Sequence, residues 1–287
     1  MLSIIVNFHN MTREAFRVIY SLTREYQGVC EGFKYEVIAI DNNSKQKIAY
    51  DQLSKLVDIF SYKTVEDRSC SPVQAINEAV SKCNGDVVMI IIDGARILSP
   101  GIFQNSWSAF RYIDNPFIIT AGFHIGPELQ NISVLNGYNQ SVEDELINGS
   151  GWKQDGYRLF DISVPAASLK RGFFGEVNES NCFLIRKSDW DRCGGYNPAF
   201  KLPGGGLANL ELFNRYIGDE KIVPVMLLGE ATFHQFHGGV ASNATLGCHP
   251  WQQFENEYIG ITGENYSPKW RDPLYIGKLN ERSKRFI

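Results

Sequence analysis

Several common features are missing from this 287-residue sequence. No apolar run approaches the roughly 20 residues that a membrane-spanning helix needs. The first residues, 1–8, carry neither a basic leader nor a small-residue cleavage site. Lys and Arg total 28 against 32 Asp and Glu, so the net charge of -4 lacks the basic excess of a general nucleic-acid binder. We therefore expect a cytoplasmic protein with no nucleic-acid partner.

Cysteine pairs of the CxxC type are also absent. Neither a zinc ribbon nor a thioredoxin-like motif is indicated, and we expect reduced, mostly structural thiols. The six cysteines are scattered along the chain: Cys30, Cys70, Cys83, Cys182, Cys193 and Cys248.

Apolar and helical patterns alternate through the first third of the chain. Short apolar runs at 2–6, 35–40 and 87–92 predict buried strands, and amphipathic patterns at 13–26, 47–56 and 71–82 predict helices. This alternation predicts an α/β fold with a mostly parallel sheet flanked by helices.

Polar side chains follow the three predicted strands: Asn7, Asp41 and Asp93. Ligands of open α/β sheets bind outside the carboxyl ends of the strands, so these residues predict a ligand site at that edge. Gly94, directly after Asp93, permits close approach of a ligand to the backbone.

The sequence changes character beyond about residue 120, where it becomes aromatic, glycine-rich and irregular through Gly175. We expect one domain over 1–247, with a ligand-binding half at 1–119 and a second, loop-rich half at 120–247. Residues 248–287 form an aromatic-rich extension that packs back on the body. Its basic end permits peripheral contact with anionic lipid at the inner face of a membrane, with a solvated tail as the alternative. The basic residues are Lys278, Arg282, Lys284 and Arg285.

A series of short motifs occurs in a fixed order along the chain. They are Asn7-Phe8-His9-Asn10, Ile40-Asp41-Asn42-Asn43-Ser44, Ala75-Ile76-Asn77, Asn84-Gly85-Asp86, Asp93-Gly94-Ala95, Arg186-Lys187 and Gly194-Gly195-Tyr196 with Phe200. In order and spacing, from residue 3 to about 237, the chain resembles the family 2 glycosyltransferases, which have the GT-A fold.

The resemblance implies transfer of a sugar from a UDP- or GDP-sugar to a glycan or lipid-linked acceptor hydroxyl, in surface polysaccharide synthesis. It places Asp41 at the base or ribose of the nucleotide, Arg68 near its uracil or phosphates, and Asp93 at the diphosphate and a divalent cation, Mn²⁺ or Mg²⁺. Carboxylates and guanidinium groups have the hydrogen-bonding geometry for these roles. The other nucleotide-site residues that it implies are Asn7, His9, Asn43 and Asn77.

The first departure from the family is Ala95, which stands where Asp-x-Asp has its second acid. Arg96 follows it and has two alternative interpretations. It either neutralises part of the diphosphate charge in place of that acid, or only pairs with surface acids.

The second departure concerns the catalytic base. Ala208 and Asn209 occupy the positions of the family's acid pair, and an asparagine cannot take a proton at neutral pH. Glu211 is the nearest substitute base. Its alternative is an exposed helix acid paired with Arg215 at i, i+4.

Two late histidines, His234 and His237, lie beside Gly238-Gly239. On a strand, residues three apart point to opposite faces, so only one of them could join Asp93 at a metal. We choose His237, because the adjacent glycines allow close approach, and expect His234 to be structural.

Two classes of function remain. The first is a glycosyltransferase whose acceptor binds on aromatic loops, and the second is a non-catalytic sugar-nucleotide or glycan binding module that lost its acids. A nucleotidyltransferase ranks lower, since no glycine-rich phosphate loop with a following basic residue occurs near the N-terminus. The residues around which the acceptor loops are expected are Trp152, Tyr157, Phe173, Phe174 and Glu179.

Overall fold

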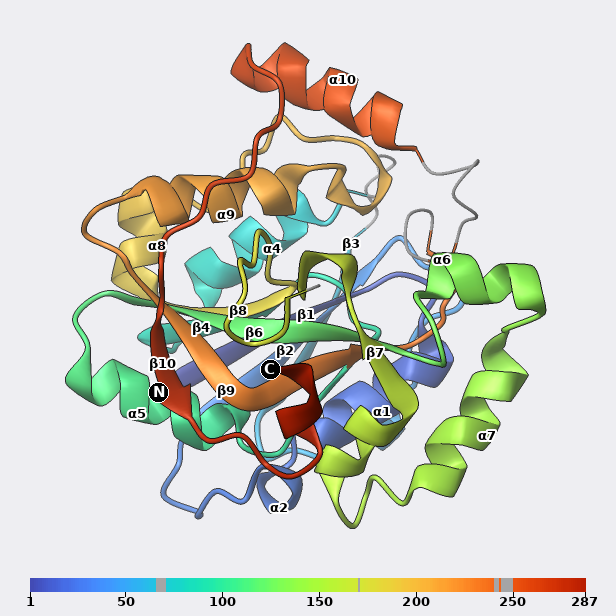
Figure 1. The fold of residues 1–287 in the computed structure, drawn as a ribbon. Helices are drawn as coiled ribbons and strands as arrows, with labels where there is room; N and C mark the ends of the chain where they lie inside the picture. The colour runs from blue at the N-terminus through green and yellow to red at the C-terminus, as the bar shows by residue number, and fades with distance from the viewer. Residues whose placement is uncertain (66–70, 170, 240–242, 244–249) are drawn as a thin grey trace.

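The computed structural model describes residues 1–65, 71–169, 171–239, 243 and 250–287. Its centre is a ten-stranded mixed sheet with the order β10-β9-β6-β8-β4-β1-β2-β3, to which β5 adds on β9 and β7 on β6. Helices cover both faces of this sheet (Figure 1). The expected α/β fold with a mostly parallel sheet is confirmed.

Parallel strands from the first third of the chain form one half of the sheet. They are β1 (Leu2–Phe8), β2 (Tyr35–Asn42), β3 (Phe60–Val65) and β4 (Val87–Ile91). β1 lies between β2 and β4, and every residue of β1 and β4 is buried. The three predicted strands form because continuous Val and Ile runs suit strands covered on both faces.

The other half of the sheet contains the antiparallel strands. β8 (Cys182–Arg186) runs antiparallel to both β4 and β6 (Pro116–Ile125), and β6 pairs in parallel with the long strand β9 (Val223–His234). Two short strands, β5 (Arg96–Leu98) and β7 (Ser163–Pro165), pair antiparallel with β9 and β6. The register sets Arg96 of β5 and His124 of β6 opposite His234 of β9.

Two sets of helices lie on opposite faces of the sheet (Figure 1). One face is covered by α4 (Val73–Lys82), α8 (Lys187–Cys193) and α9 (Ala208–Gly218). The other is covered by α1 (Thr12–Ser21), α2 (Arg24–Gln27) and α5 (Ile102–Tyr112). The buried apolar residues of α4, α8 and α9 form one core cluster, which Tyr26 of α2 also joins, and those of α1 and α5 belong to a second cluster. The sheet thus lies between two apolar layers.

Three sequence expectations need correction. The helix predicted at 13–26 is two helices, α1 and α2, separated by the N-cap Thr23, and the one at 47–56 is only the single turn α3 (Tyr50–Leu53). The segment expected to be irregular from about 120 contains the end of β6 and the helix α7 (Gln140–Ser150), which Asn139 caps. Short elements complete it: α6 (Gln130–Ser133) and the 3-10 turns η1 (Val134–Asn136), η2 (Gly156–Ile162) and η3 (Ala167–Leu169).

The last forty residues return to the body of the molecule in the described part. α10 (Trp251–Thr262) lies beyond α9 in Figure 1, β10 (Leu274–Gly277) pairs in parallel with β9, and the turn η6 (Ser283–Phe286) follows. The Phe286 ring packs 4.8 Å from that of Phe123. Within the described ranges, no helix is long and apolar enough to cross a bilayer.

Basic groups near the end of the chain have intramolecular partners. Arg282 pairs with Asp161, Lys284 with Glu281, and Arg285 donates to the carbonyl oxygen of Phe160. These contacts occupy part of the basic groups that, from the sequence, could contact anionic lipid.

Candidate functional site

A cavity of about 690 Å³ opens at the carboxyl ends of β1 and β4. This volume lies in the range of small-molecule sites, ~300–1,000 Å³. Asn7, His9, Asp93, Arg96 and His237 all line it. The edge of the sheet that the sequence indicated is therefore the edge that carries the cavity.

Asp93 is held in place by the turn that follows β4. Its Oδ1 accepts a hydrogen bond from the Ala95 amide at 3.2 Å, and the Gly94 amide donates to the Asn7 carbonyl at 2.8 Å. A Cβ on Gly94 would lie 2.5 Å from that carbonyl oxygen, so only glycine fits between β1 and this turn. The glycine thus keeps Asp93 close to the end of β1.

Two histidines converge on Asp93. The Nε2 atom of His234 lies 2.8 Å from Asp93 Oδ2, and Nε2 of His237 lies 3.6 Å from Oδ1. The ligand atoms of these three residues all lie within 4.8 Å of one another. The expectation that only one histidine could reach Asp93 is wrong, because β9 ends at His234 and the two-residue strand period does not extend to His237.

Charge in this cluster favours a cation. Burial alone would raise the pKa of Asp93, but His234 and His237 outweigh it and hold the pKa of the carboxyl far below its usual range. Burial lowers the pKa of His234 to about 4, although Asp93 opposes this shift. At neutral pH the pair is therefore a carboxylate and a neutral imidazole, the protonation states that bind metal ions.

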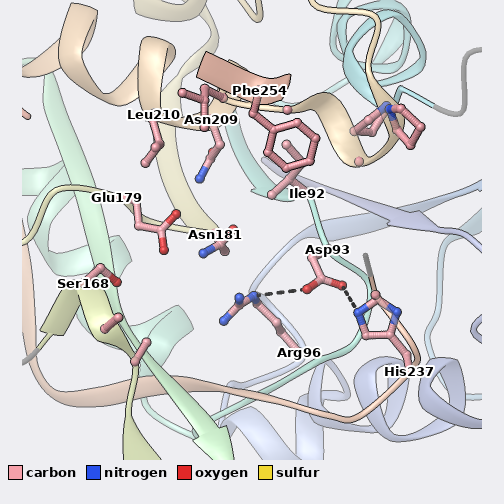
Figure 2. A pocket seen from close by; sticks show the side chains of 18 of the residues that line it. Ile92, Asp93, Arg96, Ser168, Glu179, Asn181, Asn209, Leu210, His237 and Phe254 are labelled. Carbon is pink, nitrogen blue, oxygen red and sulfur yellow. Dashed lines mark ion pairs between the residues drawn. The ribbon is translucent and has the colours of Figure 1, made fainter. Parts of the chain in front are cut away.

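Arg96 enters the cavity from β5 (Figure 2). Its side chain is 7% exposed, and its Nε lies 3.8 Å from Asp93 Oδ2. Nε and Nη1 make no hydrogen bond with any residue of the described ranges. The interpretation that Arg96 only pairs with surface acids is wrong, since the guanidinium is buried beside Asp93 and faces the cavity.

Polar groups on the far wall of the cavity face this cluster (Figure 2). Glu179 and Asn181 come from the loop before β8, and Asn209 comes from the start of α9. Asp93 and Glu179 are the two carboxylates among the described lining residues. The described lining residues therefore place Asp93, Arg96 and His237 on one side of the cavity and the second acid, Glu179, on the other.

Asn209 has a structural role. Its Oδ1 accepts from the Tyr196 hydroxyl at 3.0 Å, and its Nδ2 donates to the Ser180 carbonyl at 3.2 Å. Glu211 lies two residues further into α9, forms an ion pair with Arg215 at 2.9 Å, and does not line the cavity. This geometry matches the alternative interpretation of Glu211 as a helix acid paired with Arg215. It does not support Glu211 as the catalytic base.

Other residues implied for the nucleotide site divide into two groups. Asn7 and His9 line the cavity, and the buried Oδ1 of Asn7 accepts no hydrogen bond within the described part of the chain. Asp41, Asn43 and Asn77 do not line it.

The polar atoms of Asp41 and Asn77 have internal partners. The carboxylate of Asp41 accepts from the Tyr62 hydroxyl at 3.1 Å and the Ser44 amide at 3.2 Å, and Asn77 bonds to both backbone polar groups of Tyr196. These contacts stabilise turns, and the structure does not bring either side chain to the cavity. Arg68 lies outside the described residues.

Of the residues expected on the acceptor side, Glu179 alone lines the cavity. Trp152 and Phe173 are buried in the core, and the Tyr157 hydroxyl donates to Glu230 at 2.8 Å. Phe174 is half exposed and packs against Tyr275 of β10. The aromatic wall of the cavity comes instead from the C-terminal extension, through Trp251, Phe254 and Tyr266.

Sequence comparison finds no matching family model and no matching curated protein. Solved structures are similar in fold. Residues 1–349 of S. aureus TarS, a glycosyltransferase, in complex with UDP-GlcNAc, superpose with a TM-score of 0.53 at 14% identity, over 93% of this chain and 68% of that one. A second TarS 1–349 structure gives a TM-score of 0.51 at 14% identity, over 82% of this chain. This chain covers 60% of that fragment. The likeness shows a GT-A-like glycosyltransferase fold, as the sequence resemblance implied.

Proposed function

We propose that this protein transfers a sugar from a nucleoside diphosphate donor, a UDP- or GDP-sugar, to the hydroxyl of a glycan or lipid-linked acceptor, in surface polysaccharide synthesis. The observation that carries the proposal is the cluster of Asp93, His234 and His237 with the buried Arg96 beside it. Asp93, Arg96 and His237 line a ligand-sized cavity, and His234 is fully buried next to Asp93. The glycosyltransferase fold supports it, as does the presence of UDP-GlcNAc in a structure of similar fold.

The cation side of the cavity suits a diphosphate. Asp93, His234 and His237 offer three ligand atoms that would hold a divalent ion beside the phosphates. Two imidazoles favour Mn²⁺ over Mg²⁺, which prefers all-oxygen ligands. Such an ion would neutralise charge on the departing nucleoside diphosphate. Arg96 adds a second, fixed positive charge there and compensates for the acid missing at Ala95.

Glu179 is the proposed base in place of Glu211. It is the cavity carboxylate outside the cation cluster, on the wall opposite Asp93 (Figure 2). In an inverting transfer, Glu179 takes the proton of the acceptor hydroxyl. The acceptor oxygen forms a bond to the anomeric carbon of the donor sugar at the same time. The bond from that carbon to the diphosphate oxygen breaks, and its electron pair leaves with the nucleoside diphosphate.

The aromatic wall fits a sugar acceptor. Trp251 is 41% exposed, its ring lies 6.2 Å from that of Tyr266, and both line the cavity. Aromatic faces pack against the apolar faces of sugar rings. In this proposal the C-terminal extension binds the acceptor.

A non-catalytic binding module is the second candidate. The observation that favours it is the loss of acids at Ala95, Ala208 and Asn209, the last of which is engaged by Tyr196 and Ser180. A module of this kind would bind the nucleotide without turning it over.

Release of UDP or GDP distinguishes the two candidates. The protein is incubated with Mn²⁺, a panel of UDP- and GDP-sugars and a set of glycan acceptors, and the free nucleoside diphosphate is measured. We expect release that Asp93→Ala abolishes and that the exposed control Asp86→Ala retains. Nucleotide binding with no release from any donor would favour the module.

A further inference from the structure

Gln130 lies behind the cation cluster and is fully buried. It is the first residue of α6 and does not line the cavity. Its Oε1 is 2.7 Å from Nδ1 of His234, the ring nitrogen opposite the one that faces Asp93. Gln130 therefore contacts the imidazole from the side away from the carboxylate.

The surroundings of Gln130 determine the orientation of its amide. Its Nε2 lies 2.9 Å from the His234 carbonyl oxygen, 3.2 Å from that of Ile125 and 3.3 Å from Glu143 Oε1. All three groups accept hydrogen bonds, so the NH2 group must face them, because a flipped amide would set oxygen against oxygen three times. Asn243 donates to Oε1 at 2.9 Å, which requires the same orientation.

The amide orientation decides which nitrogen of His234 carries the proton. An amide oxygen only accepts hydrogen bonds, so Nδ1 of His234 is the donor, and Nε2 is the ring nitrogen that faces Asp93 and is left for a metal ion. We propose that Gln130 is a positioning residue that holds His234 in the Nδ1–H tautomer, so that Nε2 and Asp93 together bind a divalent cation. The inference rests on the cation site of the proposed function and adds the group that prepares it.

The distance between His234 and Asp93 agrees with this assignment. An Nε2 lone pair and a carboxylate oxygen at 2.8 Å repel each other unless a positive charge lies between them. Neighbouring ligands of an octahedral ion with bonds of ~2.1 Å are about 3 Å apart. The pair is thus spaced so that one ion, or one proton when no ion is bound, lies between the two atoms.

Gln130 also connects the two histidines. Glu143 Oε1, which accepts from Gln130, accepts from the Phe236 amide at 2.7 Å, and Arg13 donates to the Phe236 carbonyl at 2.6 Å. Phe236 is the residue before His237. One hydrogen-bonded chain thereby joins the ring of His234 to the backbone directly before His237. Such outer contacts typically change metal affinity ~10–100-fold when removed.

The direct test is the tautomer of His234 in the protein saturated with Zn²⁺, a diamagnetic ion that imidazole and carboxylate groups bind. The chain has five histidines, so long-range ¹H–¹⁵N correlation spectra are simple to assign with a His234→Gln reference. We expect a protonated Nδ1 and an unprotonated Nε2 at neutral pH. A protonated Nε2 would overturn the proposal.

The second test is Mn²⁺ affinity, measured from the electron paramagnetic resonance signal of free Mn²⁺. Gln130→Met keeps the approximate side-chain volume and removes both polar groups, and we expect ~10–100-fold weaker binding. The matched control is Gln27→Met, because Gln27 is another buried amide with several hydrogen bonds, to Ser21 and Ser99, away from the cluster. Its Mn²⁺ affinity should equal that of the wild type.

Equal affinity in Gln130→Met and wild type, or no Mn²⁺ binding by the wild type, would overturn the inference. If Gln130→Met does not fold, the wild-type tautomer still decides. Failure of the proposed function has a different signature: the Nδ1–H tautomer and Mn²⁺ binding persist, but no sugar nucleotide is bound or turned over.

Discussion

Arg96 is a buried cation with little compensation. Its nearest acid, Asp93, is 3.8 Å away, and two of its nitrogens lack hydrogen-bond partners among the described residues. Such a charge destabilises the fold unless a ligand completes its contacts. Arg96 is thus preorganised for an anion at some cost in stability.

Substitution of Arg96 should therefore separate binding from stability. In Arg96→Met we expect UDP affinity to fall ~10–100-fold, the equivalent of one charge-assisted contact. The free energy of unfolding should not decrease, because the buried Nε and Nη1 of Arg96 make no hydrogen bond with a described residue. Calorimetry and urea unfolding measure the two quantities, with the exposed Arg111→Met as control. Unchanged UDP affinity would show that Arg96 does not contact the diphosphate.

Glu179 and Glu211 are competing candidates for the base, and a pair of variants decides between them. We expect Glu179→Gln to lower kcat ~10²–10⁴-fold with donor affinity retained, since a general base acts in the chemical step. Glu211→Gln should keep its activity, because that side chain pairs with Arg215 outside the cavity. The reverse result in steady-state transfer assays would restore Glu211 as the base.

The long strand β9 joins the cavity to the opposite region of the fold. It ends at His234, and four residues earlier Glu230 is buried and accepts hydrogen bonds from Ser99, the Gly101 amide and Tyr157. Through Glu230, β9 fixes the connection between β5, which carries Arg96, and α5. Burial raises the pKa of Glu230 despite these donors.

This shift has a consequence for stability against pH. The folded state holds the Glu230 proton more tightly than the unfolded state, whose pKa is near 4.5. The contribution of Glu230 to the free energy of unfolding is therefore fully present below pH 4.5. It is lost as the pH rises through the pKa of Glu230 in the folded state. Urea unfolding across this range should show a decline in wild type that Glu230→Gln lacks, with the exposed Glu145→Gln as control. Parallel curves for wild type and Glu230→Gln would contradict the shift.

Strands were more predictable than connections. The runs at 2–6, 35–40 and 87–92 are short and rich in Val and Ile, and each is a strand. α7 was missed because its sequence offers few apolar residues, and only Ile147 and Glu143 are buried on it. Its real signal was Asn139, which caps the helix by accepting from two backbone amides.

The positions of site residues were predictable where the residue directly follows a strand. They were not predictable where the path of a loop determines the direction of the side chain. Asp93 follows β4 directly, so its place at the sheet edge was readable from the sequence. His234 was misjudged because the two-residue period was extended past the end of β9, where Gly238-Gly239 indicated a change of chain direction. In the sequence, Asp41 follows a strand in the same way as Asp93. In the structure, however, its carboxylate accepts a hydrogen bond from the Ser44 amide and does not line the cavity.

The cavity is assembled from all parts of the chain, from Asn7 in β1 to Tyr266 after α10. A ligand that bridges these walls stabilises the whole fold by mass action, by about 2.7 kcal/mol at a concentration 100 times its Kd. We expect UDP or GDP to raise the melting temperature, and Mn²⁺ to enlarge the increase in wild type and not in Asp93→Ala. No shift with any nucleotide would contradict the binding site.

The position of the bound cation is the most direct observation on this site. Crystals of the protein with Mn²⁺ and UDP, measured at the manganese absorption edge, locate the ion by its anomalous signal. We expect one peak bonded to Asp93, His234 and His237, with diphosphate oxygens on its remaining positions and Arg96 against the same phosphates. A peak elsewhere, or UDP bound without contact to Asp93 and Arg96, would contradict the nucleotide-sugar site.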